Sequence, residues 1–252
     1  MKFKYFGFSD PGRTRNHNED SYICNEKERL FLVADGMGGH ASGETASQLA
    51  VKSVQEFIIQ SRSQETAWPI EYQKDLTQEQ NRLLAAATFA NNRIQEIAHR
   101  YLSKRGMGTT FVGVALEEDH LAGVSVGDTR LYRIRDGEMS QLTEDHTLVG
   151  EQEREGMLTK DKARRHPQRH VLTRALGIER NLKMDAILSK TMGGDLYLIC
   201  SDGLHEMLED REILTEINSI EDKSLSKIAL SLVLKSNLAG GLDNITVILL
   251  SF

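Results

Sequence analysis

Residues 30–40 read LFLVADGMGGH, an uninterrupted apolar run that ends in an aspartate and a cluster of glycines. A run of this length predicts a buried strand, and the glycines predict the turn after it. Residues 196–203, LYLICSDG, repeat the arrangement, and residues 243–252, DNITVILLSF, place the acidic residue before the apolar run. A carboxylate at the end of a buried strand costs free energy unless a partner compensates it. The sequence therefore predicts that the folded protein supplies a partner for these carboxylates.

Four aspartates need such a partner, and a shared metal site would explain them together: Asp20, Asp35, Asp202 and Asp243. They are far apart in the chain, so only the fold can bring them together. Mg²⁺ and Mn²⁺ prefer oxygen ligands, and a two-ion site can activate a water and neutralise a phosphoryl group. Gly36 would let its backbone carbonyl approach an ion. The alternative is that each aspartate caps a turn, since Asp-Gly and Asp-Asn are turn signals. The occurrence of all four at the ends of apolar runs favours the metal site.

Composition and charge narrow the class of protein. The chain has 252 residues, 39% hydrophobic and 27% charged, and no linker interrupts it, which predicts a single domain over residues 1–252. The polar segment 61–75 is expected to be a long loop between helices. The net charge of -6 disfavours a nucleic-acid role, and no apolar run is long enough to span a membrane. No apolar signal segment is visible, so we expect a cytoplasmic protein with free thiols at Cys24 and Cys200.

Hydrophobic periodicity predicts the order of helices and strands. Helical spacing marks residues 46–58 and 77–101, and Thr77 with Gln80 forms a capping-box pattern. Asp136-Gly137 is a tight-hairpin signal. We expect strands over residues 2–9, 21–24, 29–34, 109–116, 121–126, 129–134, 138–142, 182–188, 195–200 and 244–252, and further helices over 147–165, 210–217 and 225–238. Hairpin connections, with helices between groups of strands, predict an α+β fold of antiparallel sheets flanked by helices.

Basic residues add a candidate anion-binding element. Arg15 lies five residues before Asp20, and its planar guanidinium suits a phosphate; the alternative is a surface ion pair. A second group forms either a solvated face or a surface that attracts anionic substrates: Lys160, Lys162, Arg164, Arg165, His166, Arg169, His170 and Arg174.

Taken in order, the motifs extend over nearly the whole chain. They are residues 9–20 (SDPGRTRNHNED), 35–40 (DGMGGH), 106–110 (GMGTT), 126–130 (VGDTR), 166–177 (HPQRHVLTRALG), 200–204 (CSDGL) and 241–246 (GLDNIT). This ordered set resembles the metal-dependent serine/threonine protein phosphatases (PPM, type 2C) in their bacterial form. The resemblance implies a four-layer α/β-β/α sandwich, in which two antiparallel sheets pack together and helices cover them.

The resemblance also implies a role for each acidic residue. Two Mg²⁺ or Mn²⁺ ions would be held by Asp20, Asp35, the carbonyl of Gly36, Asp202 and Asp243. Asp35 would bridge both ions, and Glu19 would act through water. A hydroxide between the ions would attack phosphorus directly, without a phospho-enzyme, while Arg15 binds the substrate phosphate. Positioning and charge neutralisation would then supply most of the catalysis.

Two further assignments follow from the resemblance. Asp128 matches a position that, with Asp202, holds a third, weaker ion in bacterial members; the alternative is that Gly127-Asp128 is only a strand turn. Residues 147–170 match the variable flap beside the active site, where basic residues would meet protein substrates. Asp10, by contrast, has no counterpart among the ligands that the resemblance implies, and it either orients waters bound to the ions or caps a turn.

The proton donor is left unassigned. Animal members of the family carry a histidine directly after the Asp-Gly of the second motif, and Met37 stands there instead. Methionine cannot transfer a proton. His40, three residues further on, is a candidate donor or an ordinary loop residue, and a metal-bound water is another source.

The function implied is hydrolysis of phosphoserine and phosphothreonine in proteins. Phosphorylated proteins are then the expected partners, with a serine/threonine kinase or its targets as candidates, and a signalling role and a monomer are expected. A catalytically inactive member that binds phosphorylated partners is the alternative, which the intact acidic positions argue against. A metal nuclease is disfavoured by the acidic net charge and the lack of a basic, aromatic-interleaved groove.

Overall fold

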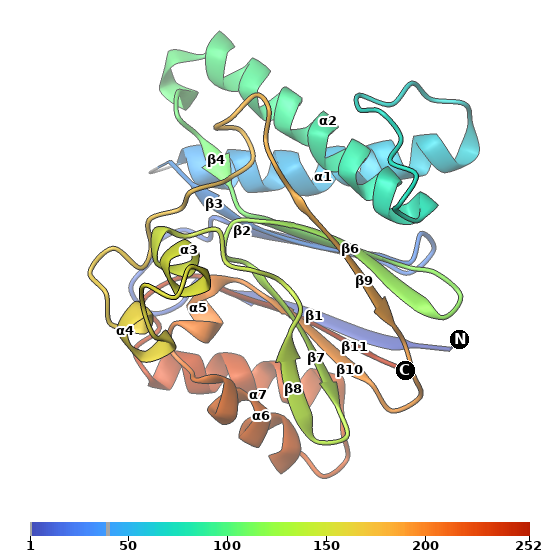
Figure 1. Cartoon of the computed structure of the whole chain (residues 1–252). Coiled ribbons are helices and arrows are strands. Elements are labelled where there is room, and N and C mark those ends of the chain that lie inside the picture. The colour runs from blue at the N-terminus through green and yellow to red at the C-terminus, as the bar shows by residue number, and fades with distance from the viewer. Residues whose placement is uncertain (1, 39–40) are drawn as a thin grey trace.

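Two antiparallel sheets pack face to face in the computed structural model, which describes residues 2–38 and 41–252 (Figure 1). The first sheet has the order β1-β11-β10-β7-β8, and its strands are β1 (Lys4–Asp10), β7 (Arg130–Arg135), β8 (Glu138–Gln141), β10 (Leu196–Cys200) and β11 (Ile245–Ser251). The second has the order β2-β3-β5-β6-β9, with β4 paired to β3, and its strands are β2 (Asp20–Asn25), β3 (Leu30–Met37), β4 (Gly108–Thr109), β5 (Phe111–Leu116), β6 (His120–Val126) and β9 (Asp185–Lys190).

Helices cover the outer face of each sheet (Figure 1). Over the second sheet lie α1 (Ala41–Ser63) and α2 (Gln78–Arg100), with the short helix η1 (Leu102–Lys104) after them. Over the first sheet lie α5 (Asp202–His205), α6 (Asp210–Ser219) and α7 (Leu225–Leu238). The flap carries α3 (Leu148–Arg154) and α4 (Lys160–Arg164). The four-layer α/β-β/α sandwich is therefore confirmed.

Alternation along β3 shows why this sequence folds into layers. Phe31 and Val33 are buried between the two sheets, where they belong to the same apolar cluster as Tyr197 of β10. Leu30 and Leu32 point the other way and pack with the helices α1 and α2. Because successive strand residues face opposite sides, a continuous apolar run is what a strand with two buried faces requires.

Local signals in the sequence are largely confirmed. The Thr77–Gln80 capping box is formed at the start of α2, and α7 has the predicted bounds. Asp136 and Gly137 both have positive φ, at 52° and 80°, in the hairpin between β7 and β8. Both cysteines are free thiols, although Cys24 is only partly buried. In the described residues, no helix combines the length and apolar character needed to cross a membrane.

Candidate metal centre

The predicted acidic residues meet where the ends of strands from both sheets come together. Asp20 is the first residue of β2, and Asp35 stands near the end of the neighbouring strand β3. Asp202 begins α5 directly after β10, and Asp243 precedes β11. Asp35, Asp202 and Asp243 line one cavity of about 730 Å³, which Asp128 also reaches.

Asp20 joins the two sheets through hydroxyl groups. Its Oδ2 accepts hydrogen bonds from the hydroxyls of Ser201, at 2.7 Å, and Thr246, at 2.6 Å. Both donors belong to the first sheet or to its immediate ends, whereas Asp20 belongs to the second. Ser201 and Thr246 lie within two of the sequence motifs, but their role could not be predicted, because a hydroxyl that fixes a carboxylate leaves no spacing signal.

The carboxylates raise one another's pKa values. Burial raises the pKa of Asp35 well above its ordinary value, and the charges of Asp20 and Asp202 add to the effect. Burial and the charges of Asp128 and Asp243 raise that of Asp202. Burial raises the pKa of Asp20 to about 6, although its two hydroxyl donors oppose the change. A site that holds so much negative charge is stable when a cation neutralises it.

Two buried oxygens fit an ion and lack a protein partner. Oδ1 of Asp20 and Oδ1 of Asp202 are shielded from solvent and accept no hydrogen bond within the described residues. In a native protein such atoms require an explanation, and a hard cation bound by oxygen ligands supplies one. As the side chains stand, no three Asp, Glu, His or Cys side chains in the described parts of the chain are arranged to hold an ion.

Arg15 is the partner of Asp243. Its Nη2 lies 2.6 Å from Oδ2 of Asp243, and the side chain of Arg15 is half exposed at the cavity. A guanidinium at this position can reach an anion that enters the cavity. Glu19 also lines the cavity, and burial raises its pKa.

One predicted residue, Asp10, does not line the cavity of the acidic cluster. Asp10 caps a turn: its Oδ1 accepts hydrogen bonds from the backbone N–H of Gly12, at 2.9 Å, and from Asn237, at 3.0 Å. Met37 lines the cavity, as its place in the motif requires. His40, the candidate proton donor, lies outside the described residues.

Two buried histidines form hydrogen bonds with the backbone of the turn that carries Asp128. The backbone N–H of Gly127 donates to Nδ1 of His146 at 3.1 Å, so the other ring nitrogen carries the proton, and it faces Oδ2 of Asp185 at 3.0 Å. Nε2 of His205 lies 3.0 Å from the carbonyl oxygen of Asp128. Burial lowers the pKa of His205 to about 3, so the ring is neutral and donates this bond. Neither histidine could be predicted from the sequence, because no motif or periodicity singles it out.

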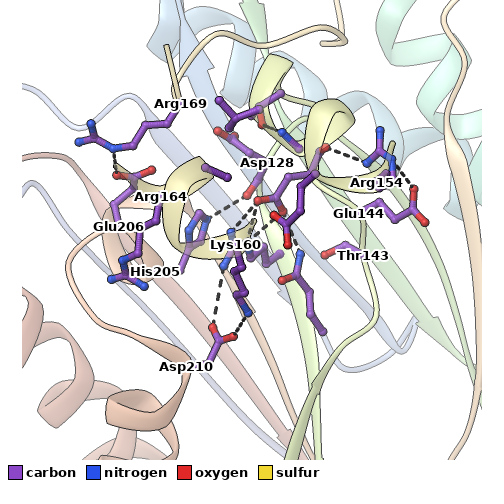
Figure 2. A pocket seen from close by; sticks show the side chains of 18 residues that line it. Asp128, Thr143, Glu144, Arg154, Lys160, Arg164, Arg169, His205, Glu206 and Asp210 are labelled. Atoms are coloured by element: carbon purple, nitrogen blue, oxygen red, sulfur yellow. Dashed lines mark hydrogen bonds and ion pairs between the residues drawn. The ribbon is translucent and has the colours of Figure 1, made fainter. Parts of the chain in front are cut away.

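The flap is tied to the first sheet's helices by ion pairs. Lys160 Nζ lies 2.8 Å from Asp210 Oδ2, and Arg169 Nε lies 2.9 Å from Glu206 Oε2; Figure 2 shows both pairs across a second cavity of about 400 Å³. This cavity shares Asp128, Arg169 and Glu206 with the first. Of the basic residues between 160 and 174, Arg169 and His170 line the cavity of the acidic cluster.

Comparison with known proteins identifies the family. A family model described as protein phosphatase 2C matches residues 13–224. The serine/threonine phosphatase stp of Listeria innocua serovar 6a is 36% identical over 244 residues, which cover 96% of this chain and 92% of that protein.

Solved structures agree. The serine/threonine phosphatase PstP/Ppp of Mycobacterium tuberculosis superposes with a TM-score of 0.85 at 33% identity, covering 99% of this chain and 98% of that one. The serine/threonine phosphatase of S. agalactiae gives 0.86 at 32% identity, covering 99% of each chain. The catalytic domain of PstP in complex with two manganese ions gives 0.81 at 33% identity, covering 99% of this chain and 97% of that one. The chain therefore belongs to the protein phosphatase 2C family and is a metal-dependent protein-serine/threonine phosphatase.

Proposed function

We propose that this phosphatase binds two Mg²⁺ or Mn²⁺ ions at its acidic cluster and a third, weaker ion beside it. The two ions would be held by Asp20, Asp35, the carbonyl of Gly36, Asp202 and Asp243, with Asp35 between them; Asp128 and Asp202 would hold the third. The observation that carries the proposal is the pair of buried, partnerless oxygens on Asp20 and Asp202. The complex of the related PstP catalytic domain with two manganese ions supports a site for two ions.

The bound ions supply Lewis acidity and an activated water at the reacting phosphorus. The chain's own residues do the rest by position and charge. The hydroxyls of Ser201 and Thr246 fix one oxygen of Asp20 and leave the other without a protein partner. Arg15, at the exposed edge of the cavity, would exchange its contact with Asp243 for the phosphate of the substrate. Glu19 would hold water near the cluster.

The surroundings suggest how the enzyme is used. We propose a single catalytic domain over residues 1–252, in which the flap, residues 147–170, contacts protein substrates. Phosphorylated proteins are the substrates, and a serine/threonine kinase or its targets are candidate partners in a cytoplasmic signalling role. We expect the enzyme to act as a monomer. The acidic net charge supports proteins over nucleic acids as partners.

A phosphate-release assay tests the proposal. With Mn²⁺, the protein should release phosphate from p-nitrophenyl phosphate and from a phosphothreonine peptide, and EDTA should stop both. Asp243→Asn should abolish most of the activity. Full activity in EDTA or in Asp243→Asn would refute the assigned metal site, and no release by the wild-type protein would favour an inactive, phosphoprotein-binding member. Intact nucleic acid after incubation with metal would dismiss a nuclease.

A further inference from the structure

Exposed apolar side chains stand at the cavity that holds the acidic cluster. Leu242 is 54% exposed and Ile178 is 48% exposed, and both line this cavity together with Asp35 and Asp202. Large apolar side chains that remain half exposed beside a binding cavity are candidates for contact with a ligand. A phosphate group alone would make no favourable contact with these apolar side chains.

The two side chains belong to opposite halves of the sandwich. Leu242 directly precedes Asp243 and β11 in the first sheet, with Met207 close to the same loop. Ile178 packs over Gly108 of β4 with Met37 of β3, in the second sheet. Because the acidic cluster is drawn from both sheets, a peptide held over it would meet apolar surface from each.

The charged groups at the cavity do not favour charged neighbours of the phosphorylated residue. Arg169 of the flap is already paired with Glu206, and Arg15 is the proposed phosphate ligand. Glu19 lines the same cavity and would repel an acidic residue next to the phosphate. Of the apolar side chains that line the cavity, Leu242 and Ile178 are the most exposed, so they are the surface that can distinguish one flanking residue from another.

We propose that this site prefers phosphoproteins whose residues next to the phosphoserine or phosphothreonine are apolar, because their side chains bury Leu242 and Ile178. The inference rests on the proposed function, since it places the substrate phosphate at the acidic cluster. Burying one half-exposed leucine or isoleucine against an apolar partner changes binding by about fivefold to tenfold.

Two phosphothreonine peptides test the preference. They differ only in the residues immediately before and after the phosphothreonine, which are leucine in one and serine in the other. With Mn²⁺, the wild-type enzyme should have a kcat/KM at least about tenfold higher for the leucine peptide. In Leu242→Ser and Ile178→Ser this ratio should fall by about threefold or more each, and in the double variant it should approach one.

The chain offers a matched control. Leu230 on α7 is 48% exposed and does not line the cavity, so Leu230→Ser should keep the wild-type ratio. Equal kcat/KM values for the two peptides, or a ratio that falls as much in Leu230→Ser, would overturn the inference. Hydrolysis of p-nitrophenyl phosphate, which has no flanking residues, separates the cases. If the wild-type enzyme hydrolyses it yet shows no peptide preference, the inference alone fails; if it does not, the proposed function fails too.

Discussion

Asp20 and Asp35 are direct cross-strand partners in the antiparallel ladder of β2 and β3. Like charges at directly opposite positions destabilise a sheet. Here the two strands are held together by the rest of the fold, so the repulsion is stored in the metal-free protein. A cation between the two carboxylates turns this repulsion into attraction. Metal binding should therefore contribute to folding as well as to catalysis.

Replacing one of these carboxylates should have opposite effects on stability and on activity. Asp35→Asn removes the charge that faces Asp20, so the melting temperature in EDTA should rise by about 2–4 °C, for about 1 kcal/mol. Phosphatase activity with Mn²⁺ should fall on the order of 10²-fold or more. Thermal unfolding with and without Mn²⁺ measures the first effect. Asp136→Asn, in the exposed β7–β8 turn, is the matched control and should change neither; a lower melting temperature of Asp35→Asn in EDTA would contradict the argument.

The metal-free protein should lose stability as the pH rises from about 5 to about 7. The folded-state pKa values of Asp20 and Asp128 are raised by burial to about 6 and about 7, above those of the unfolded chain. The folded protein therefore keeps protons that the unfolded chain has lost, and this contribution disappears as the pH passes through 6 and 7. The slope is up to about 1.4 kcal/mol per pH unit for each proton kept.

Urea unfolding in EDTA at several pH values measures this slope. In saturating Mn²⁺ the trend should reverse, because the ions bind the deprotonated carboxylates. A metal-free protein that gains stability between about pH 5 and about pH 7 would show that other groups dominate. Asp145 does not interfere with this test. Burial raises its pKa, but the charge of Arg130 and the hydrogen bonds to Asp145 together outweigh burial and lower the pKa below its ordinary value. The stability that Asp145 contributes is therefore lost only in more acidic solution.

Arg15→Ala should weaken substrate binding more than metal binding. Loss of the guanidinium should raise KM for a phosphopeptide by about tenfold, as expected for a hydrogen bond to a charged group. The affinity for Mn²⁺ should stay within about threefold of the wild type, because Asp243 loses only its competing partner. Calorimetry and steady-state kinetics separate the two constants. Arg13→Ala, in the same exposed loop, should leave both unchanged, and a collapse of metal binding in Arg15→Ala would make Arg15 structural.

Gly36→Ala should be among the most damaging small substitutions in the chain. A Cβ at Gly36 would lie 2.2 Å from the carbonyl oxygen of Gly43 in α1, a backbone atom that cannot move aside alone. We expect a loss of about 3 kcal/mol in the free energy of unfolding. Gly193→Ala is the control, since a Cβ there meets nothing within 4 Å. Equal stability of the two variants would refute the close packing of α1 against β3.

The hydrogen bond from His205 should stabilise the turn that carries Asp128. His205→Phe removes the donor to the carbonyl of Asp128 and should cost about 1–3 kcal/mol in unfolding free energy. It should also raise the Mn²⁺ concentration needed for half-maximal activity. His205→Gln places an amide N–H near the position of Nε2 and should restore much of both. If Gln behaves like Phe, the hydrogen bond is not the reason for the effect.

The buried strands and their acidic ends could be predicted from sequence because each is marked locally. The apolar run at residues 30–34 predicts a strand, and Asp35 indicates where that strand ends. The same holds for Asp202 after β10, whereas the short helix α5 that begins there was not expected. Four residues of helix leave too little periodicity to detect.

Contacts that join distant segments could not be predicted. Nothing in the sequence indicates that Thr246 donates to Asp20, or that His205 reaches the carbonyl of Asp128. Such bonds depend on how the two sheets are placed against each other, which no local pattern records. The basic stretch between 160 and 174 shows the same limit. Nη1 of Arg174 lies 3.6 Å from Oδ1 of Asp185, whereas Lys160 forms an ion pair with Asp210. Basic residues of one stretch of sequence therefore have partners in different parts of the fold.

The pairing of β1 with β11 joins the two ends of the chain at the edge of the first sheet. β1 lies at the edge of its sheet and pairs along its whole length with the last strand of the chain, from Lys4 opposite Ser251 to Asp10 opposite Ile245. Asp243 and the hydroxyl of Thr246 arrive on the same late segment. A chain in which β11 has not yet paired therefore has an unpaired β1, and Asp20 lacks one of its two hydroxyl donors. The acidic cluster can assemble only after the segment that carries Asp243 and β11 has folded against β1.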